Sequence, residues 1–243
     1  MGPYEGTTVR VEASGKIVVK TGAASQGQGH HTMISMIVAE NLGVTPEDII
    51  FESADTGKFP HGIGAIGSRI AANVAPSAFD AASKVREKAL KLAAEILETA
   101  EADLDIEAGI VRVNGAPDVS ISLGELAIKL TPPSSTRVPK GFDPILEATS
   151  FEGSSGSPIA SGTNVAEVEV DIGTGEVKVL RYSVAHDCGV MINPTIVHGQ
   201  IVGGVVHGIG NALFERMIYD DQGQPLTMNY GEYLLPLASE MPR

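Results

Sequence analysis

The chain has 243 residues, of which 43% are hydrophobic and 19% are charged, and its formal net charge at pH 7 is −13. This composition is typical of a globular protein, and an acidic chain without a basic stripe is not expected to bind nucleic acid. The one cysteine, Cys188, excludes a disulfide framework and favours a reducing, cytoplasmic compartment. Residues 1–5 lack the basic and apolar regions of a secretory signal.

The N-terminal part of the sequence predicts short strands and a helix. Strand patterns occur at Thr7–Glu12, Ile17–Thr21 and Ile49–Ser53, and a helix pattern at Thr32–Leu42. Residues 13–15 predict a hairpin turn between the first two strands, and Gly43 suits the left-handed cap at the end of the helix. A glycine-rich loop, Gln26–Gly29, lies between the second strand and the helix.

A second glycine-rich loop, Gly62–Gly67, precedes the clearest helix pattern of the chain. Apolar residues recur at spacings of three and four over residues 78–96, which is the period of one helix face. We therefore expect a helix that begins after Pro76, with Ser77 and Asp80 at its cap.

The middle of the chain predicts a hairpin, a short helix and then a linker. The Asn-Gly turn at residues 114–115 joins strand patterns at Ile110–Val113 and Val119–Ile121, and a capping box at Ser122–Glu125 starts a short helix. Four prolines within residues 131–146 indicate a linker or a long crossing loop.

The C-terminal part predicts a second hairpin and a long helix. Apolar and acidic residues alternate over residues 166–171, and residues 173–175 turn the chain into a strand at Val177–Val184. The segment Pro194–Met217 is mostly apolar but carries several polar side chains. We therefore expect it to form a buried core helix rather than a membrane span.

These elements predict a mixed α/β fold with α+β character, in which helices pack on small twisted sheets in two lobes. We expect the first lobe at residues 1–130, the linker at 131–146, and the second lobe, with the long helix at its centre, at 147–243. The sequence contains no internal repeat and no low-complexity tract.

The loop Gln26-Gly27-Gln28-Gly29 is the first candidate binding site. Glycines let a backbone approach a ligand closely, and the start of the following helix offers free N–H groups with positive dipole character. An anionic head group of a cofactor would suit this arrangement. The ordinary alternative is a tight turn that leads into a buried helix.

The second candidate is the Gly62–Gly67 loop, which has the G-x-G-x-x-G spacing of dinucleotide-binding folds. A Rossmann site requires a strand that ends at the first glycine, but the preceding strand ends near Ser53. It also requires an acidic residue at the end of the next strand, about twenty residues further on, but the residue found there, Glu87, lies within a helix. A Rossmann site is therefore not expected. Ser68 and Arg69 follow the loop and offer a hydroxyl and a fork of donors. An arginine at such a position is more commonly a surface or salt-bridge residue.

The third candidate is Gln200, on the long helix. Glycines at positions 199, 203, 204 and 208 create flat stripes against which another element can pack. A buried amide without partners would cost about 1–3 kcal/mol, so Gln200 is expected to bond to a neighbouring loop or to a cofactor. The six histidines and Cys188 lack metal-ligand spacing and an elbow motif, so neither a protein-ligated metal nor a cysteine nucleophile is expected.

Taken together, several stretches in register resemble the molybdenum-cofactor-binding subunit of the xanthine dehydrogenase family, which includes aldehyde oxidases and aerobic carbon monoxide dehydrogenases. They are Gly2–Gly6 (GPYEG), Gly22–Thr32 (GAASQGQGHHT), Gly64–Arg69 (GAIGSR), Asp187–Gln200 (DCGVMINPTIVHGQ), the glycines at 203, 204, 208 and 210, and Tyr233–Pro236 (YLLP). The match extends over essentially the whole chain and corresponds to the C-terminal part of the molybdopterin-binding domain. His31, where an acidic residue is frequent, and Ile70, where some relatives have serine, depart from the family pattern.

The resemblance implies a cofactor site. In such proteins the QGQG loop and the GSR loop hold the pterin and its phosphates, and a glutamine on the later helix contacts the cofactor. The corresponding residues of this chain are Gln26, Gly27, Gln28, Gly29, Gly67, Ser68, Arg69 and Gln200. The implied cofactor is molybdopterin with molybdenum, in the cytosine dinucleotide form usual in bacterial members.

The resemblance also implies a molybdenum hydroxylase that oxidises an aldehyde, an N-heterocycle or carbon monoxide with water as the oxygen source. The family's general base is a glutamate in a G-x-G-E stretch beyond the Tyr233–Pro236 segment, and the sequence ends at Arg243, so no catalytic residue is assigned here. We therefore expect a fragment that is inactive alone. The implied partners are the rest of the molybdenum subunit, an iron–sulfur subunit and an FAD subunit; a homodimer is left open, and no membrane is involved.

Two other functions remain open at this point. A non-catalytic assembly module would use the glycine stripes for protein contacts, and an independent nucleotide-binding enzyme would use the Gly62–Gly67 loop. Substitution of Ser68 and Gln200 would leave partner binding intact in the first case, and nucleotides would raise the melting temperature in the second. If the cofactor assignment holds, Gln28, Ser68 and Gln200 should face one cleft.

Overall fold

The computed structural model describes residues 4–131, 138–153, 156 and 158–242, which form two compact units that divide between Pro158 and Ile159. Small mixed sheets with packed helices confirm the expected α/β fold class. Strand β7 (Glu147–Glu152) belongs to the first unit because it pairs with β1 along its whole length. The division therefore falls after β7 rather than within residues 131–146, of which residues 132–137 lie outside the described part of the chain.

The first unit is built on a four-stranded sheet with the strand order β3-β2-β1-β7. Its other strands are β1 (Glu5–Val11), β2 (Ile17–Thr21) and β3 (Ile49–Ser53). β1 is antiparallel to β2, as the predicted hairpin requires, and to β7, whereas β2 and β3 are parallel. Side chains of alternate residues, such as Val9 and Val19, are fully buried on one face, as the period of two in a strand dictates.

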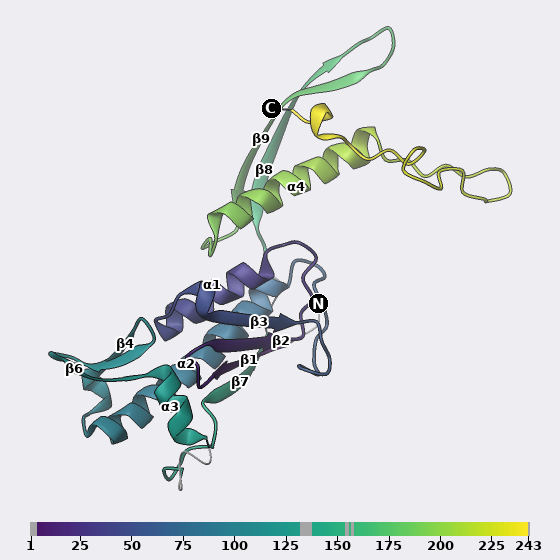
Figure 1. Cartoon of the computed structure of the whole chain (residues 1–243). Helices are drawn as coiled ribbons and strands as arrows, with labels where there is room; N and C mark the ends of the chain where they lie inside the picture. The colour runs from purple at the N-terminus through teal and green to yellow at the C-terminus, as the bar shows by residue number, and fades with distance from the viewer. Residues whose placement is uncertain (1–3, 132–137, 154–155, 157, 243) are drawn as a thin grey trace. The chain divides into compact units, whose positions relative to one another are not determined.

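Two helices cover the buried face of this sheet (Figure 1). The helices α1 (His30–Leu42) and α2 (Ile70–Leu97) pack against each other; α1 also contacts β3, and α2 contacts β1 and β7. Gly43 ends α1 in the left-handed conformation, as predicted. The core of the unit therefore lies between one helical layer and one sheet.

The start of α2 differs from the prediction. The helix begins at Ile70 and carries Pro76 inside it, although proline lacks the N–H group of an intrahelical hydrogen bond. Ser77 and Asp80 are therefore not cap residues, and Ser77 is buried with its hydroxyl 2.7 Å from that of Thr7 on β1. Packing of this stretch on the sheet outweighs the local preference of proline for a helix start.

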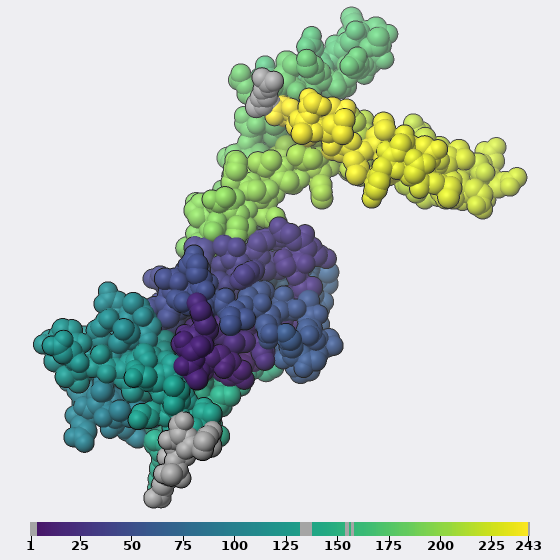
Figure 2. Space-filling model, viewed as in Figure 1, coloured from purple at the N-terminus to yellow at the C-terminus, as the bar shows by residue number. Residues whose placement is uncertain are grey.

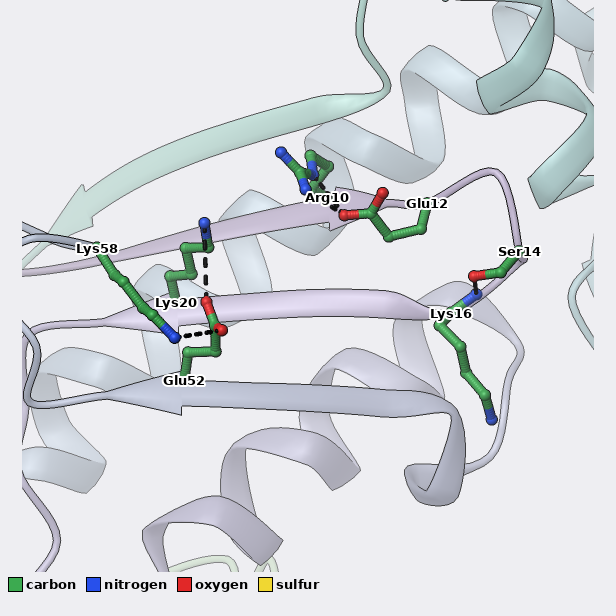
Figure 3. A network of polar contacts seen from close by, with 7 residues as sticks. All are labelled: Arg10, Glu12, Ser14, Lys16, Lys20, Glu52 and Lys58. Atoms are coloured by element: carbon green, nitrogen blue, oxygen red, sulfur yellow. Dashed lines mark hydrogen bonds and ion pairs between the residues drawn. The ribbon is translucent and has the colours of Figure 1, made fainter.

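The other face of the sheet carries polar side chains. Glu52 forms ion pairs with Lys20 at 3.7 Å and with Lys58 at 2.6 Å, and Arg10 pairs with Glu12 (Figure 3). These side chains lie in front of the strands in this view, whereas the helices lie behind them. Ion pairs at such a surface add little to stability, so this face is a solvated surface and not a second core.

A smaller sheet and a short helix complete the first unit. The sheet has the strand order β4-β5-β6, and its strands are β4 (Leu104–Glu107), β5 (Ile110–Val113) and β6 (Ala116–Ser122). Gly115 has a φ of 82° in the predicted Asn-Gly turn, and Ser122 forms the predicted capping box of α3 (Leu123–Leu130). Single 3₁₀ turns occupy Pro46–Asp48, Glu101–Asp103 and, in the second unit, Ala238–Glu240.

The second unit consists of a long hairpin, one helix and an extended C-terminal segment. The hairpin pairs β8 (Ser161–Val170) with β9 (Val177–Asp187), and α4 spans Pro194–Leu213. Both elements were predicted, although α4 ends before Met217. In the space-filling view this unit consists of thin segments, coloured green to yellow, rather than stacked layers (Figure 2).

The expectation that α4 is a buried core helix is wrong for the chain as described. Of the helix residues, Ile209 and Gly210 are buried, and the others are partly or fully exposed. An apolar pattern predicts a helix whose surface is buried against another element, but it does not specify whether that element belongs to the same chain or to a partner polypeptide. No helix among the described residues is both long and apolar enough to cross a membrane.

Candidate functional site

Both glycine-rich loops leave the sheet at the same edge. Because β2 and β3 are parallel and Thr21 pairs with Ser53, the chain emerges from both strands at one end of the sheet. The first loop, residues 22–29, connects β2 to α1. The second glycine-rich loop lies in the segment that connects β3 to α2. Ligands of α/β sheets bind outside the carboxyl ends of parallel strands, so this edge is a favourable position for a site.

The two loops touch through a pair of glycines. A Cβ atom added to Gly22 would lie 1.9 Å from the carbonyl oxygen of His61, and one added to Gly62 would lie 2.5 Å from the carbonyl oxygen of Gly22. Neither position accepts a side chain unless the backbone moves. This close approach brings the two loops side by side with backbone against backbone.

The Gln26–Gly29 loop presents its backbone to solvent. Gln26 and Gly27 are exposed, and Gln28 and Gly29 are partly buried. Gly27 and Gly29 have φ angles of 99° and 75°, in the region that favours glycine. The side chain of Gln28 folds back on the loop: its Oε1 accepts a hydrogen bond from the N–H of Gln26 at 2.5 Å, and its Nε2 donates to Oε1 of Gln26 at 3.1 Å.

The second loop, like the first, has positive φ angles just before its helix. Gly67 and Ser68 are exposed and have φ angles of 58° and 56°, and Arg69 then returns to the right-handed region. In the first loop the left-handed residue is the N-cap Gly29, which the helical His30 follows, whereas in the second loop Ser68 lies one residue before the N-cap Arg69. A left-handed residue next to a right-handed one directs successive N–H groups to one side, which makes a concave site for an anion.

Both helix starts are open to a ligand. Within the described residues, α1 and α2 have no side-chain cap and no acidic residue in the first turn. The free N–H groups and the positive end of each helix dipole are therefore available to a negative group. Each helix start, with its adjacent loop, therefore fits an anionic group such as a phosphate.

The side chain of Arg69 is directed into the protein. Its exposed fraction is 1%, and Nη1 forms an ion pair with the buried carboxylate of Glu5. Nη1 also donates a hydrogen bond to the carbonyl of Gly64 at 3.1 Å, and Nη2 donates to the carbonyl of Tyr4 at 3.0 Å. Of the two roles that the sequence left open for Arg69, the structure thus shows the salt bridge.

His30, the first residue of α1, is a buried histidine at the edge of the site. Its exposed fraction is 7%, and its Nδ1 has no hydrogen-bond partner within the described part of the chain. Burial lowers the pKa of the imidazole below its ordinary value, and a hydrogen bond to the backbone of Ala24 opposes this only in part. His30 is therefore neutral at physiological pH and adds no positive charge to the site.

Gln200 lies in the second unit, and its side chain is exposed rather than buried as expected. The amide therefore has access to water and needs no protein partner. The two loops, which both belong to the first unit, touch at Gly22 and Gly62, and that the Gln26–Gly29 and Gly67–Arg69 segments hold one ligand stays a prediction. That Gln28, Ser68 and Gln200 face one cleft stays a prediction.

Two features that shape the site were not predicted from the sequence. Glu5 is a fully buried acidic residue, and burial of a carboxylate requires a charged or hydrogen-bonding partner, but the neighbouring residues in the sequence do not mark it as buried. The contact of Gly22 with Gly62 has no local signal, because the two glycines are distant in sequence. Cys188 is exposed, and no group of three or more potential metal ligands occurs in the region that the structure describes.

Known protein sequences match the whole chain. A family model described as a molybdopterin cofactor-binding domain matches residues 1–242. The chain is 39% identical to subunit gamma of the 6-hydroxypseudooxynicotine dehydrogenase complex of Paenarthrobacter nicotinovorans and 32% identical to the carbon monoxide dehydrogenase large chain of Afipia carboxidovorans. The alignments cover 100% and 99% of this chain but 30% and 29% of those relatives, so the chain spans less than a third of their length.

Solved structures match the fold over the same extent. Quinoline 2-oxidoreductase from Pseudomonas putida 86 matches with a TM-score of 0.86 at 39% sequence identity, and a Cu,Mo carbon monoxide dehydrogenase matches with a TM-score of 0.87 at 31% identity. Both alignments cover 100% of this chain, and they cover 31% and 30% of the solved chains. The likeness in fold therefore includes the two loops and the helices that follow them.

Proposed function

The chain belongs to the molybdopterin cofactor-binding domain family, and from this premise we propose that its two glycine-rich loops hold the phosphate-bearing part of a molybdopterin cofactor. The observation that supports this most strongly is the shared geometry of the helix starts, in which a left-handed residue leads into an uncapped helix without an acidic first turn. Because the loops meet at Gly22 and Gly62, they suit a ligand with more than one anionic group.

Backbone groups supply most of the proposed contacts. The Gln26–Gly29 loop forms one side of the site, and the N–H groups that follow Gly67 form the other. The side chains of Gln26 and Gln28, which now bond to each other, would exchange those hydrogen bonds for polar atoms of the pterin. Gln200 would add an amide contact from the second unit.

The complete enzyme that we infer is a molybdenum hydroxylase. When bound, the cofactor supplies a molybdenum centre that accepts electrons from the substrate and receives oxygen from water. The relatives include, by name, a nicotine 6-hydroxylase, a quinoline 2-oxidoreductase and carbon monoxide dehydrogenases. We infer that this protein oxidises an N-heterocycle, an aldehyde or carbon monoxide, with the cytosine dinucleotide form of the cofactor and with iron–sulfur and FAD partner subunits.

We also infer that the isolated chain does not turn over substrate. The two loops offer backbone donors and amides, which bind and orient a cofactor but do not transfer protons. The second unit exposes apolar side chains such as Val165 and Val202, at 60% and 46%, which a further polypeptide would shield from water.

Cofactor content in the assembled enzyme tests the proposed site. The chain is purified with its partner subunits from a host that makes the cofactor, and molybdenum and released cytidine monophosphate are measured per chain for the wild type, Gly27→Val and Gly15→Val. Gly27 and Gly15 have φ angles of 99° and 84°, and neither has an atom within 4 Å of an added Cβ. The two substitutions therefore impose similar backbone strain, but Gly15 lies in the turn at the other end of β2.

We expect Gly15→Val to keep its cofactor and Gly27→Val to bind it at least about tenfold more weakly and so to contain less of it, since one charge-assisted hydrogen bond corresponds to about 1.5–3 kcal/mol. Equal occupancy of the two variants would contradict the proposed site. Molybdenum without cytidine monophosphate would contradict only the dinucleotide form of the cofactor.

One observation favours an additional role in assembly. Gly199, Gly203, Gly204 and Gly208 of α4 have no atom within 4 Å of an added Cβ among the residues that the structure describes. We infer that the glycine stripes receive an element of a partner polypeptide. Gln200→Ala should then leave subunit assembly intact and lower the cofactor content, whereas a protein that serves only assembly would contain no cofactor even in its wild-type form.

A further inference from the structure

A buried ion pair supports the second glycine-rich loop from within the protein. Glu5 is the first residue of β1, and Arg69 precedes α2; both side chains are buried. Oε1 of Glu5 pairs with Nη1 of Arg69 and also accepts a hydrogen bond from the N–H of Ile63 at 3.0 Å. Nη1 donates in addition to the carbonyl of Gly64 at 3.1 Å. The pair therefore ties both the beginning and the end of the loop to the edge of the sheet.

The part of the loop held between these contacts is the part that faces solvent. Gly67 and Ser68 are exposed and left-handed, a conformation that is strained for serine. Strained backbone persists only where the surrounding structure over-determines it. Arg69 follows Ser68 directly, so contacts that fix the arginine also fix the peptide groups that would face an anion.

The charge of Arg69 is neutralised inside the protein. Nη1 pairs with Glu5 and also donates to the carbonyl of Gly64, and Nη2 donates to the carbonyl of Tyr4. Both terminal nitrogens of the guanidinium are thus engaged by buried protein groups and are directed away from the exposed surface of the loop. Removal of one member of such a pair leaves a buried charge without compensation.

We propose that Glu5 and Arg69 are positioning residues: their ion pair holds the N–H groups after Gly67 in the orientation that binds an anion, and the guanidinium does not itself contact that anion. The inference rests on the proposed function, because it takes the loop to bind a phosphate group. It also makes an acidic residue a requirement for anion binding. A direct role for Arg69 predicts the opposite, since loss of the negative charge of Glu5 would then strengthen the attraction.

Glu5→Gln distinguishes a positioning role of Arg69 from a direct contact with the anion, because the two roles predict opposite changes in anion affinity. The full chain is titrated with inorganic pyrophosphate by calorimetry, and amide hydrogen exchange is followed at Ile63. We expect Glu5→Gln to weaken pyrophosphate affinity about tenfold and to accelerate exchange at Ile63, because the oxygen that accepts its N–H loses its negative charge and becomes a weaker acceptor. An affinity equal to or above that of the wild type would overturn the proposal.

Two further variants separate positioning from a general loss of stability. Leu92→Ala removes a fully buried side chain about 35 Å along α2 from Arg69, at about 1.5 Å per residue, and should lower Tm without changing the affinity. Arg69→Lys keeps the positive charge but loses the planar fork. We expect it to weaken pyrophosphate binding as much as Glu5→Gln does, whereas a direct electrostatic contact predicts near wild-type affinity.

The outcomes also distinguish this inference from the proposed function. Absence of pyrophosphate binding by the wild-type chain would overturn both. Tight binding by Glu5→Gln, or by Arg69→Lys if Glu5→Gln does not fold, would overturn the positioning role and leave the cofactor site standing.

Discussion

Ser68 has a backbone conformation that costs a residue with a side chain about 1–2 kcal/mol, and it lies beside Gly67, which adopts nearly the same φ without that cost. Glycine would be the more stable residue at position 68. In the proposed site the serine hydroxyl faces solvent at the start of α2, where it is available to donate a hydrogen bond to a phosphate oxygen. The strain and the hydroxyl together are consistent with a residue that serves binding.

Substitution of Ser68 by glycine should therefore separate stability from binding. We expect Ser68→Gly to raise the free energy of unfolding by about 0.5–1 kcal/mol, because the left-handed conformation no longer carries a steric cost, and to lower cofactor occupancy. Ala108 also has a positive φ, 51°, in the exposed turn between β4 and β5, so Ala108→Gly is a matched control that should gain stability and keep its cofactor. A loss of stability in Ser68→Gly, measured by urea unfolding, would contradict this explanation.

The buried His30 makes the stability of the chain depend on pH. Burial lowers its pKa in the folded state, so the unfolded chain binds the proton more readily. The stability associated with neutral His30 is fully present above the ordinary value of 6.5 and is lost as the pH falls through the folded pKa. Below pH 6.5 we expect Tm to fall more steeply in the wild type than in His30→Gln, and the exposed neighbour His31 provides the control, His31→Gln. Equal slopes in all three proteins would argue against this role.

At the scale of single residues the sequence predicts the glycines of the site but not the buried ion pair that supports the second loop. Gly27, Gly29 and Gly67 stand out because glycine between a strand and a helix has a local conformational reason. The Glu5–Arg69 pair joins the two ends of a stretch of more than sixty residues, and single-sequence reasoning has no means to pair such residues. The orientation of Arg69 followed only from the structure.

At the scale of elements, α2 and α4 differ in what their apolar faces contact. The face of α2 that includes Val74, Val85 and Leu92 is fully buried against the sheet and its neighbours. Most glycines of α4 have open space where a side chain would be. A helix with such gaps has the backbone cost of glycine without a packing contact to offset it.

Alanine substitutions within α4 should reveal this difference. Gly203→Ala should stabilise the isolated chain by about 1 kcal/mol, because it raises helix propensity and meets no atom. Gly210→Ala should destabilise it, since an added Cβ would lie 2.7 Å from Oε1 of Glu215 and 3.1 Å from Pro236. The measurement is helicity by circular dichroism during thermal unfolding. A loss of stability in Gly203→Ala would show that the stripe is already packed.

Elements with local signals were predicted, and those that depend on distant contacts were not. The hairpin turn at Gly115 and the capping box of α3 are encoded within a few residues, so their positions agree with the sequence. The start of α2 was misplaced because its first turns are stabilised by packing on β1 across Pro76. The pairing of β7 with β1, which sets the boundary of the first unit, likewise depends on residues far apart in the chain.

At the scale of the whole molecule, the two units differ in how much apolar surface they bury. The first unit has a continuous core that includes residues of the main sheet, α1, α2 and α3. In the second unit, as far as the structure describes it, Ile209 is the one large apolar side chain that is buried. Because burial of apolar surface is the main source of stability, the second unit has little that would keep it folded by itself.

Hydrogen exchange on the isolated chain should show this difference directly. We expect amides of β1 and β2 to exchange slowly, and amides of α4, β8 and β9 to exchange much faster, because elements with few buried contacts open at low free energy. In the assembled enzyme the second unit should become protected. Equal protection of both units in the isolated chain would mean that the second unit is stable without a partner.

The most direct test of the cofactor site is an experimental structure of the assembled enzyme loaded with its cofactor. We predict phosphate oxygens within hydrogen-bond distance of the backbone N–H groups of Gly27–Gly29 and of Ser68–Ile70, with the Arg69 guanidinium still paired to Glu5. A cofactor whose phosphates contact neither of these segments would contradict it.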